Sequence, residues 1–192
     1  YRVTMYDPEP NRFGFINTGF AASSCNKLFK TELFKSLQYP EDVANDDVEV
    51  ILAIMYKYKA AYTDKTYYNY YQRPGSTQNG YVSRKKLDVF RSMENLKTNI
   101  GQTPNAKIWE VIIWHQVIML LLAVLPKAPG ISHRKELIKE FCQKADEYNI
   151  DVINNRGFDN YTAQATLNKV YGNGIRFLLR HKLYLLCSAF MK

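Results

Sequence analysis

Apolar residues recur at helical spacing along most of the chain, and this pattern predicts a mainly helical protein. The clearest case is residues 46–59, where a one-sided apolar run begins at two adjacent carboxylates. Ser23 or Ser24 can cap an earlier helix over about 26–36. Further helices are expected over about 83–99, 108–125, 132–148 (capped by Ser132), 162–171 and 175–192, with Gly172 and Gly174 separating the last two.

Two short segments have strand character instead. Residues 60–64 and 66–71 are rich in β-branched and aromatic side chains, which predicts two strands joined by a tight turn. Their tyrosines fit packing within a sheet better than a platform for sugar rings. Residues 1–20, which hold prolines and glycines, and 73–80 are expected to be mostly loop.

The fold class expected from these elements is α+β and mainly helical, with a short two-stranded β element. Turn-forming residues at 101–104 divide the chain into residues 1–100 and a helical C-terminal extension over 101–192. Residues 108–125 are apolar enough to suggest a membrane span. Because Glu110 lies inside this run and Pro126 ends it, a buried helix is the better interpretation.

The charge and the cysteines narrow the class of protein. A net charge of +8 predicts an anionic partner, and the absence of a basic-aromatic reader motif argues against nucleic acid. Cys25, Cys142 and Cys187 are odd in number and widely spaced, which indicates a reducing, cytoplasmic environment without a disulfide framework or a metal site. The chain starts at Tyr1 without an initiator methionine or signal segment, so we expect a piece of a longer protein.

The last predicted helix is basic and amphipathic. Such a helix can lie at the inner face of a membrane and attract anionic lipid, or it can pack on its own domain with solvated charges. The apolar stripe is Ile175, Leu179, Leu183, Leu186 and Phe190, and the basic group is Arg176, Arg180, His181 and Lys182.

Asp46 and Asp47, at the start of the helix over 46–59, are the candidate chemistry of the chain. Carboxylates at a helix start can cap its unpaired N–H groups and complement its dipole. They can equally be a catalytic base and a helper group. The spacing of the pair alone fits both readings.

The surrounding motifs favour catalysis. Over roughly residues 23–96 the chain resembles the acceptor half of family 2 glycosyltransferases with a GT-A fold. The matching motifs, in the family's order, are Asn26-Lys27-Leu28-Phe29-Lys30, Tyr39-Pro40-Glu41, Asp46-Asp47 and Tyr70-Tyr71-Gln72-Arg73-Pro74-Gly75-Ser76.

The resemblance implies a role for each matched residue. Asp47 falls where the family has the base that deprotonates the acceptor hydroxyl in an inverting transfer, and Asp46 replaces the more usual glutamate beside it. Lys27, Arg73 and Ser76 would bind substrate, with the two cations facing the diphosphate or the acceptor. Tyr71 stands where the family often has arginine.

The resemblance also implies what lies elsewhere. The family binds its nucleotide-sugar donor in an N-terminal half, with a divalent cation (Mg²⁺ or Mn²⁺) on an Asp-x-Asp motif, and this chain contains neither that motif nor a glycine-rich phosphate loop. We therefore expect no cofactor in this chain, an inactive isolated fragment, and a glycan or lipid-linked acceptor for the intact enzyme. The alternative is a non-catalytic helical module that binds an anionic surface or a protein partner.

Overall fold

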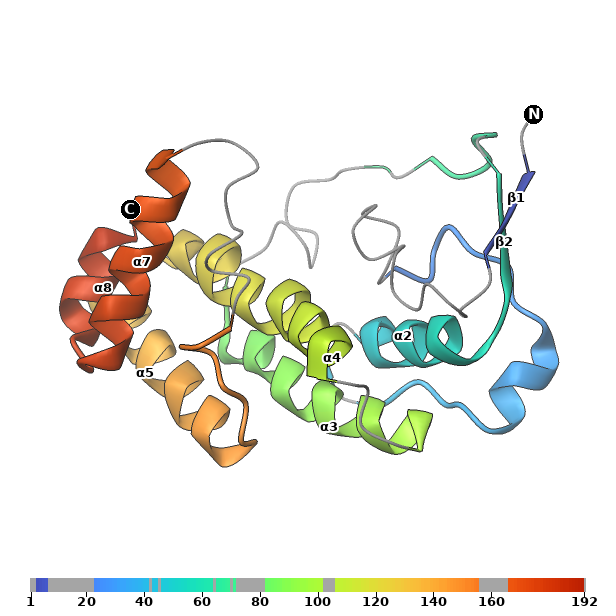
Figure 1. The fold of residues 1–192 in the computed structure, drawn as a ribbon, viewed down its shortest axis with the longest axis horizontal. Helices are drawn as coiled ribbons and strands as arrows, with labels where there is room; N and C mark the ends of the chain where they lie inside the picture. The colour runs from blue at the N-terminus through green and yellow to red at the C-terminus, as the bar shows by residue number, and fades with distance from the viewer. Residues whose placement is uncertain are drawn as a thin grey trace. The chain divides into compact units, whose positions relative to one another are not determined.

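The computed structural model describes residues 3–6, 23–41, 43–44, 46–63, 65–69, 71, 82–101, 106–155 and 166–191 (Figure 1). These residues are mainly helical, as the apolar periodicity predicts. In chain order the elements are β1 (Val3–Tyr6), η2 (Thr31–Lys35), α2 (Asp47–Lys57), β2 (Ala60–Thr63), η3 (Arg84–Asp88), α3 (Val89–Ile100), α4 (Ala106–Ile113), η4 (Trp114–Ile118), η5 (Leu120–Val124), η6 (Leu125–Lys127), α5 (Ile131–Glu147), α7 (Thr166–Arg180) and α8 (Tyr184–Phe190).

Contacts within the chain form two compact units. The first comprises Tyr1–Gly80 and Arg91–Ile108, and the second comprises Tyr81–Phe90 and Trp109–Lys192. The division of the chain into residues 1–100 and 101–192 stays a prediction. The left-handed residue Gly101 (φ 73°), which directly follows α3, allows the chain to turn there.

Helix α2 is the core of the first unit. Its apolar residues follow one another almost without interruption, so the helix is buried nearly all round, and Val50, Ile51 and Leu52 are fully inaccessible to solvent. Within this unit α2 is tied to α3 by two polar contacts. The Asn95 amide donates to Glu49 Oε2 at 3.0 Å, and Lys57 Nζ donates to the Asn99 carbonyl. The helix expected over 46–59 is therefore confirmed.

The helix expected over about 26–36 is wrong in its first half. Residues 26–30 are not helical, and only the 3-10 turn η2 forms. Here the Lys27 N–H closes a tight turn onto the Ser24 carbonyl, and Leu28 is fully exposed. The aromatic residues gather locally instead, because the Phe34 ring stacks on Tyr39 at 5.8 Å and meets the Phe29 ring edge-on at 5.6 Å.

The predicted strand over 60–64 forms, but its partner is not the one expected. Strand β2 pairs antiparallel with β1, with Val3 opposite Thr63 and Tyr6 opposite Ala60 (Figure 1). The second expected strand, over 66–71, is wrong, because residues 66–69 and 71 have no strand structure. The described tyrosines of this segment do not pack in a sheet either: Tyr67 is 74% exposed, Tyr68 is 45% exposed and Tyr71 is 85% exposed.

In the second unit, α4 continues through the π-helical segments η4 and η5 into the 3-10 turn η6. Ile108–Lys127, with 20 residues and a mean hydropathy of 2.1, is the one helical stretch among the described residues that is long and apolar enough to cross a membrane. Core helices of globular proteins meet the same criteria, and 44% of the stretch is buried within the chain. Its buried residues Ile112, Ile118 and Leu121 agree with the expected core helix.

Helices α3 and α5 meet in this unit through aromatic side chains. Phe141 of α5 lies edge-on to Phe90 at 5.1 Å, and Phe90 also stacks on Tyr148 at 6.1 Å. Phe90 and Phe141 are both fully buried. The helix expected over 132–148 is confirmed, although its N-cap residue is Gly130 (φ 77°) rather than Ser132.

The C-terminal part departs from its prediction in two ways. Gly172 and Gly174 lie inside α7 rather than between helices. The single helix expected over 175–192 is instead split, because α7 ends at Arg180 and Lys182 adopts a left-handed backbone (φ 55°) before α8 begins. The two helices run side by side in opposite directions, and α8 also packs on α5 (Figure 1).

Candidate functional site

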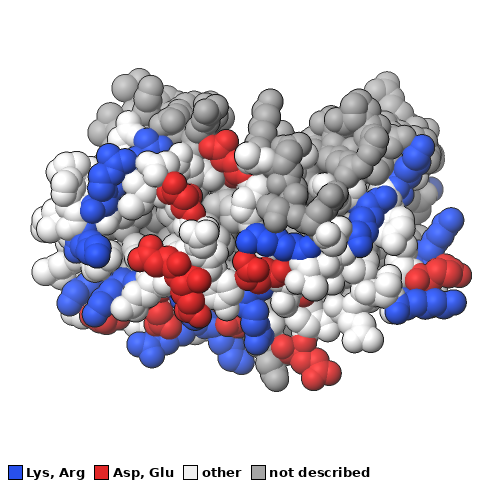
Figure 2. All heavy atoms as spheres, turned by 60° about the horizontal axis from the view of Figure 1, so that its bottom comes forward, with Lys and Arg blue, Asp and Glu red and all other residues white. Residues whose placement is uncertain are grey.

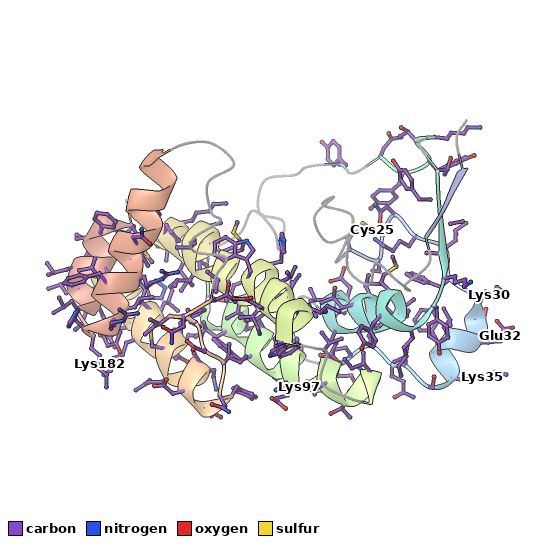
Figure 3. All side chains as sticks on the ribbon, viewed as in Figure 1. Cys25, Lys30, Glu32, Lys35, Lys97 and Lys182 are labelled. Carbon is purple, nitrogen blue, oxygen red and sulfur yellow. The ribbon has the colours of Figure 1, made fainter. Side chains whose placement is uncertain are left out.

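The start of α2 brings the acidic pair next to the Asn26-Lys27-Leu28 turn. The Ser24 backbone N–H donates to Asp47 Oδ2 at 3.1 Å, across 23 positions of sequence. This hydrogen bond joins Asp47 to the turn that leads into the Asn26-Lys27-Leu28-Phe29-Lys30 motif, in one half-buried place. Figure 3 shows the first unit with Cys25 labelled beside this turn, and Lys30, Glu32 and Lys35 of the following segment extending into solvent.

Lys27 lies at the same place with its ammonium group close to the acidic pair. Lys27 Nζ donates to Asn26 Oδ1 at 2.8 Å and to the Ser23 carbonyl. Partial burial lowers the pKa of Lys27, and the negative charges of Cys25 and Asp47 counteract that shift. The ammonium is therefore near enough to Asp47 for each charge to act on the other.

Asp47 has the properties of a tuned carboxylate. Partial burial raises its pKa above the usual 3.8, and the negative charge of Asp46 raises it further. The Ser24 N–H and the positive charge of Lys27 act in the opposite direction, because both favour the ionised form. A carboxylate with a raised pKa is a stronger base than an ordinary surface aspartate, which suits proton abstraction.

Asp46 differs from its neighbour. It is exposed, it occupies the N-cap position of α2 with a helical backbone (φ −55°, ψ −24°), and its side chain makes no capping hydrogen bond. An N-cap residue normally has an extended backbone and accepts a hydrogen bond from the first turn. The geometry of Asp46 therefore lacks the interaction by which a cap stabilises a helix.

Arg73 and Ser76, the other two expected substrate-binding residues, lie outside the described residues, as does Gln72. Their roles stay predictions.

Sequence reasoning missed one buried carboxylate. Glu49 is 3% exposed, and burial raises its pKa although the Asn95 amide binds the ionised form. The signal was present, since Glu49 interrupts an otherwise apolar run. Because Glu49 joins α2 to α3, its role is to hold the helix that carries Asp47.

The described residues do not fit a metal site. Among them, no three His, Cys, Asp or Glu side chains come together as a metal ion requires. An ammonium group, Lys27, already provides positive charge beside Asp47. We therefore derive no step through a metal at this pair, and the divalent cation of the intact enzyme stays a prediction.

The three thiols should differ sharply in reactivity. Cys25 is exposed, with the Ser23 hydroxyl 2.8 Å from its sulfur, whereas burial raises the pKa of both Cys142 and Cys187 to about 12. Because the thiolate is the reactive form, we expect a disulfide reagent at neutral pH to modify only Cys25 rapidly. Cys142 and Cys187 should react only after unfolding. Stopped-flow absorbance measures this, and a fast phase that survives in Cys25→Ser would contradict it.

Comparisons of the chain with protein-family models, with curated protein sequences and with solved structures found no match. The roles of these residues therefore rest on their own geometry and chemistry.

Proposed function

We propose that this chain is the acceptor-side part of a family 2 glycosyltransferase with a GT-A-like fold. In the intact enzyme it would transfer a sugar, with inversion, from a nucleotide-sugar donor to a hydroxyl of a glycan or lipid-linked acceptor. The observation that carries the proposal is the hydrogen bond from the Ser24 N–H to Asp47, since it holds Asp47 beside the turn that leads into the Asn26-Lys27 motif, and the resemblance assigns both motifs to one site.

Asp47 would act as the general base. Its carboxylate takes the proton of the acceptor hydroxyl while that oxygen bonds to the anomeric carbon and the nucleotide diphosphate leaves from the opposite face. Lys27, beside Asp47, would orient the acceptor or offset the negative charge of the departing diphosphate. Asp46 supports the base indirectly, because its charge raises the pKa of Asp47.

The exposed tyrosines of the first unit are consistent with a sugar acceptor. Tyr67 and Tyr71 are largely exposed, although Lys65 Nζ lies over the Tyr67 ring at 5.0 Å from its centroid. An aromatic ring combines an apolar face with a polar hydroxyl, as does a sugar. The prediction that these rings pack within a sheet is wrong. The alternative, that they stack against sugar rings, stays open.

The alternative function is a non-catalytic helical module that binds an anionic surface or a protein partner. One observation favours it, namely the exposed apolar side of α8. Measuring sugar transfer by the intact protein with Asp47 and with Asp47→Asn separates the two functions. A glycosyltransferase should lose transfer in the variant, whereas a non-catalytic module does not depend on the carboxylate.

We expect this chain by itself to bind no nucleotide. The Asp-x-Asp motif on which the family holds its metal and diphosphate is absent from it. Calorimetric titration with uridine diphosphate and Mn²⁺ should therefore give no saturable heat, whereas the intact enzyme serves as the positive control. Micromolar binding by the chain alone would show that the donor site has been assigned to the wrong part.

A further inference from the structure

The apolar stripe predicted for the C-terminal helix is only half buried. Ile175 and Leu179 are at most 4% exposed and pack inward. The rest of the stripe is partly exposed, and two further exposed residues join it. The exposed apolar side chains are Phe177 (57%), Leu183 (40%), Leu185 (55%), Leu186 (55%) and Phe190 (44%).

Leu183, Leu185, Leu186 and Phe190 share one side of α8, whereas Phe177 belongs to α7. At about 100° per residue, Leu183 and positions 185, 186, 189 and 190 fall on one arc of the helix. Cys187, Ser188 and Met191 fall on the opposite arc and are buried. The exposed arc contains no charged residue, so α8 is a helix with one packed apolar side and one solvent-facing apolar side.

The exposed side is held in a defined orientation. Ser188 Oγ donates to the Ile131 carbonyl at 2.6 Å, which fixes α8 to the start of α5. The Phe190 ring stacks on Tyr171 at 5.4 Å and lies against Gly174, which fixes α8 to α7. The outward leucines therefore belong to a packed helix and are not the loose end of a chain.

Positive charge surrounds this side. Residues 166–192 contain five Lys or Arg and no Asp or Glu. Arg180 and Lys182 lie at the turn that precedes α8, where Figure 3 shows Lys182 pointing away from the helices. Acidic groups near this region include Asp151, whose pKa is lowered mainly by hydrogen bonds from Asn154 and also by the charge of Arg180, and Asp146, whose charge acts on Tyr184.

The outer surface of α5 differs in charge. It is lined by Arg84, Glu136, Lys139, Glu140, Gln143, Lys144 and Glu147, with Arg84 paired to Glu140 at 2.9 Å. On the face drawn in Figure 2, acidic and basic side chains are likewise intermixed. The α7–α8 pair thus combines exposed apolar residues with a sequence that contains basic but no acidic residues.

We propose that the exposed side of α8, together with Phe177 and the Arg180–Lys182 turn, docks on an anionic lipid membrane. Leu183, Leu185 and Leu186, with Phe177, would enter the boundary between headgroups and acyl chains, and the two cations would contact lipid phosphates. An interfacial helix needs this pairing of an apolar side with flanking basic residues. The proposal does not depend on glycosyl transfer.

Co-sedimentation of the full chain with vesicles tests the proposal. We compare phosphatidylcholine vesicles with vesicles that also contain phosphatidylglycerol, and expect binding to the second only. Leu185→Ser combined with Leu186→Ser should lower the partition coefficient by about 100-fold or more, because two leucines that would be buried in the membrane are lost. Arg180→Gln with Lys182→Asn should lower it by roughly tenfold, and asparagine tolerates the left-handed backbone at 182.

The matched control is Tyr67→Ser, which removes an aromatic side chain of the first unit that is more exposed (74%) than either leucine (55%) and should leave vesicle binding unchanged. Circular dichroism checks that each variant folds. Equal pelleting of the double-leucine variant and the wild type would overturn the proposal, as would equal binding to both vesicle types. Dimerisation of the wild type, lost in the leucine variant and without vesicle binding, would overturn it in favour of a protein contact.

Discussion

Replacing Asp47 with asparagine is expected to lower kcat of the intact enzyme by about 10²–10⁴-fold, the usual contribution of a general base. Asparagine has nearly the same shape but accepts no proton from the acceptor hydroxyl. Because the base acts only in the transition state, kcat and kcat/KM should fall together while substrate affinity is kept. Steady-state kinetics with saturating donor and varied acceptor measure both constants.

The substitution should leave the fold intact. The amide oxygen of an asparagine at this position can still accept the hydrogen bond that the Ser24 N–H now gives to Asp47. Burial raises the pKa of Asp47 on folding, so the folded state binds the carboxyl proton more tightly than the unfolded state. The ionised carboxylate therefore destabilises the folded state. This loss of stability begins as the pH rises past the usual 3.8 and is complete above the pKa of the folded state. A neutral side chain removes the cost, and Asp47→Asn should therefore unfold no more easily than the wild type at neutral pH.

Asp46→Asn is the matched control, one position away and solvent-exposed. It should retain turnover to within about tenfold, because Asp46 does not take the proton. It should also move the acidic limb of the pH–rate profile to lower pH, since the charge of Asp46 raises the pKa of Asp47. Full turnover by Asp47→Asn, or equal losses in the two variants, would contradict the assignment of the base.

The second large effect concerns stability. Phe141→Ala is expected to destabilise the second unit by about 3–5 kcal/mol, the range for removing a large buried aromatic side chain. The Phe141 ring is fully buried and lies edge-on to Phe90 at 5.1 Å, so its removal leaves a cavity between α5 and the start of α3. Urea denaturation should show a lower midpoint.

Phe177→Ala provides the control for this measurement. The Phe177 side chain is 57% exposed, so its truncation should change the free energy of unfolding by less than about 1 kcal/mol. If both alanine variants lost the same stability, Phe141 would not be the centre of the core of the second unit.

Local periodicity was sufficient to place α2 and α5, but it misplaced α7. Residues that define α2 and α5 repeat every three or four positions, and their observed ends lie close to those expected. Which distant segments pair with each other could not be predicted from local periodicity. The partner of β2 is β1, far earlier in the chain, whereas the sequence favoured the adjacent tyrosine-rich segment. Adjacent residues offer the simplest hairpin, but nothing local records which strand is the better partner.

The candidate site shows the same limit. The sequence identified Asp47 and Lys27 as separate residues of two motifs, and it suggested serine caps for the segment after Ser24. The structure uses the Ser24 N–H to bind Asp47 instead, across 23 positions. Burial of both charged groups arises from this long-range contact, so the direction of neither pKa shift could be predicted from spacing.

Gly174 and Phe190 pack so closely that each limits the size of the side chain at the other position. A Cβ at position 174 would lie 2.9 Å from Phe190 Cζ, closer than real side-chain contacts allow. Glycine within a helix costs about 1 kcal/mol relative to alanine, so this position would otherwise favour a larger residue. A larger side chain at 174 would therefore force the Phe190 ring away from α7, and a smaller residue at 190 would relieve the clash. The close packing of α7 on α8 thus depends on both positions together.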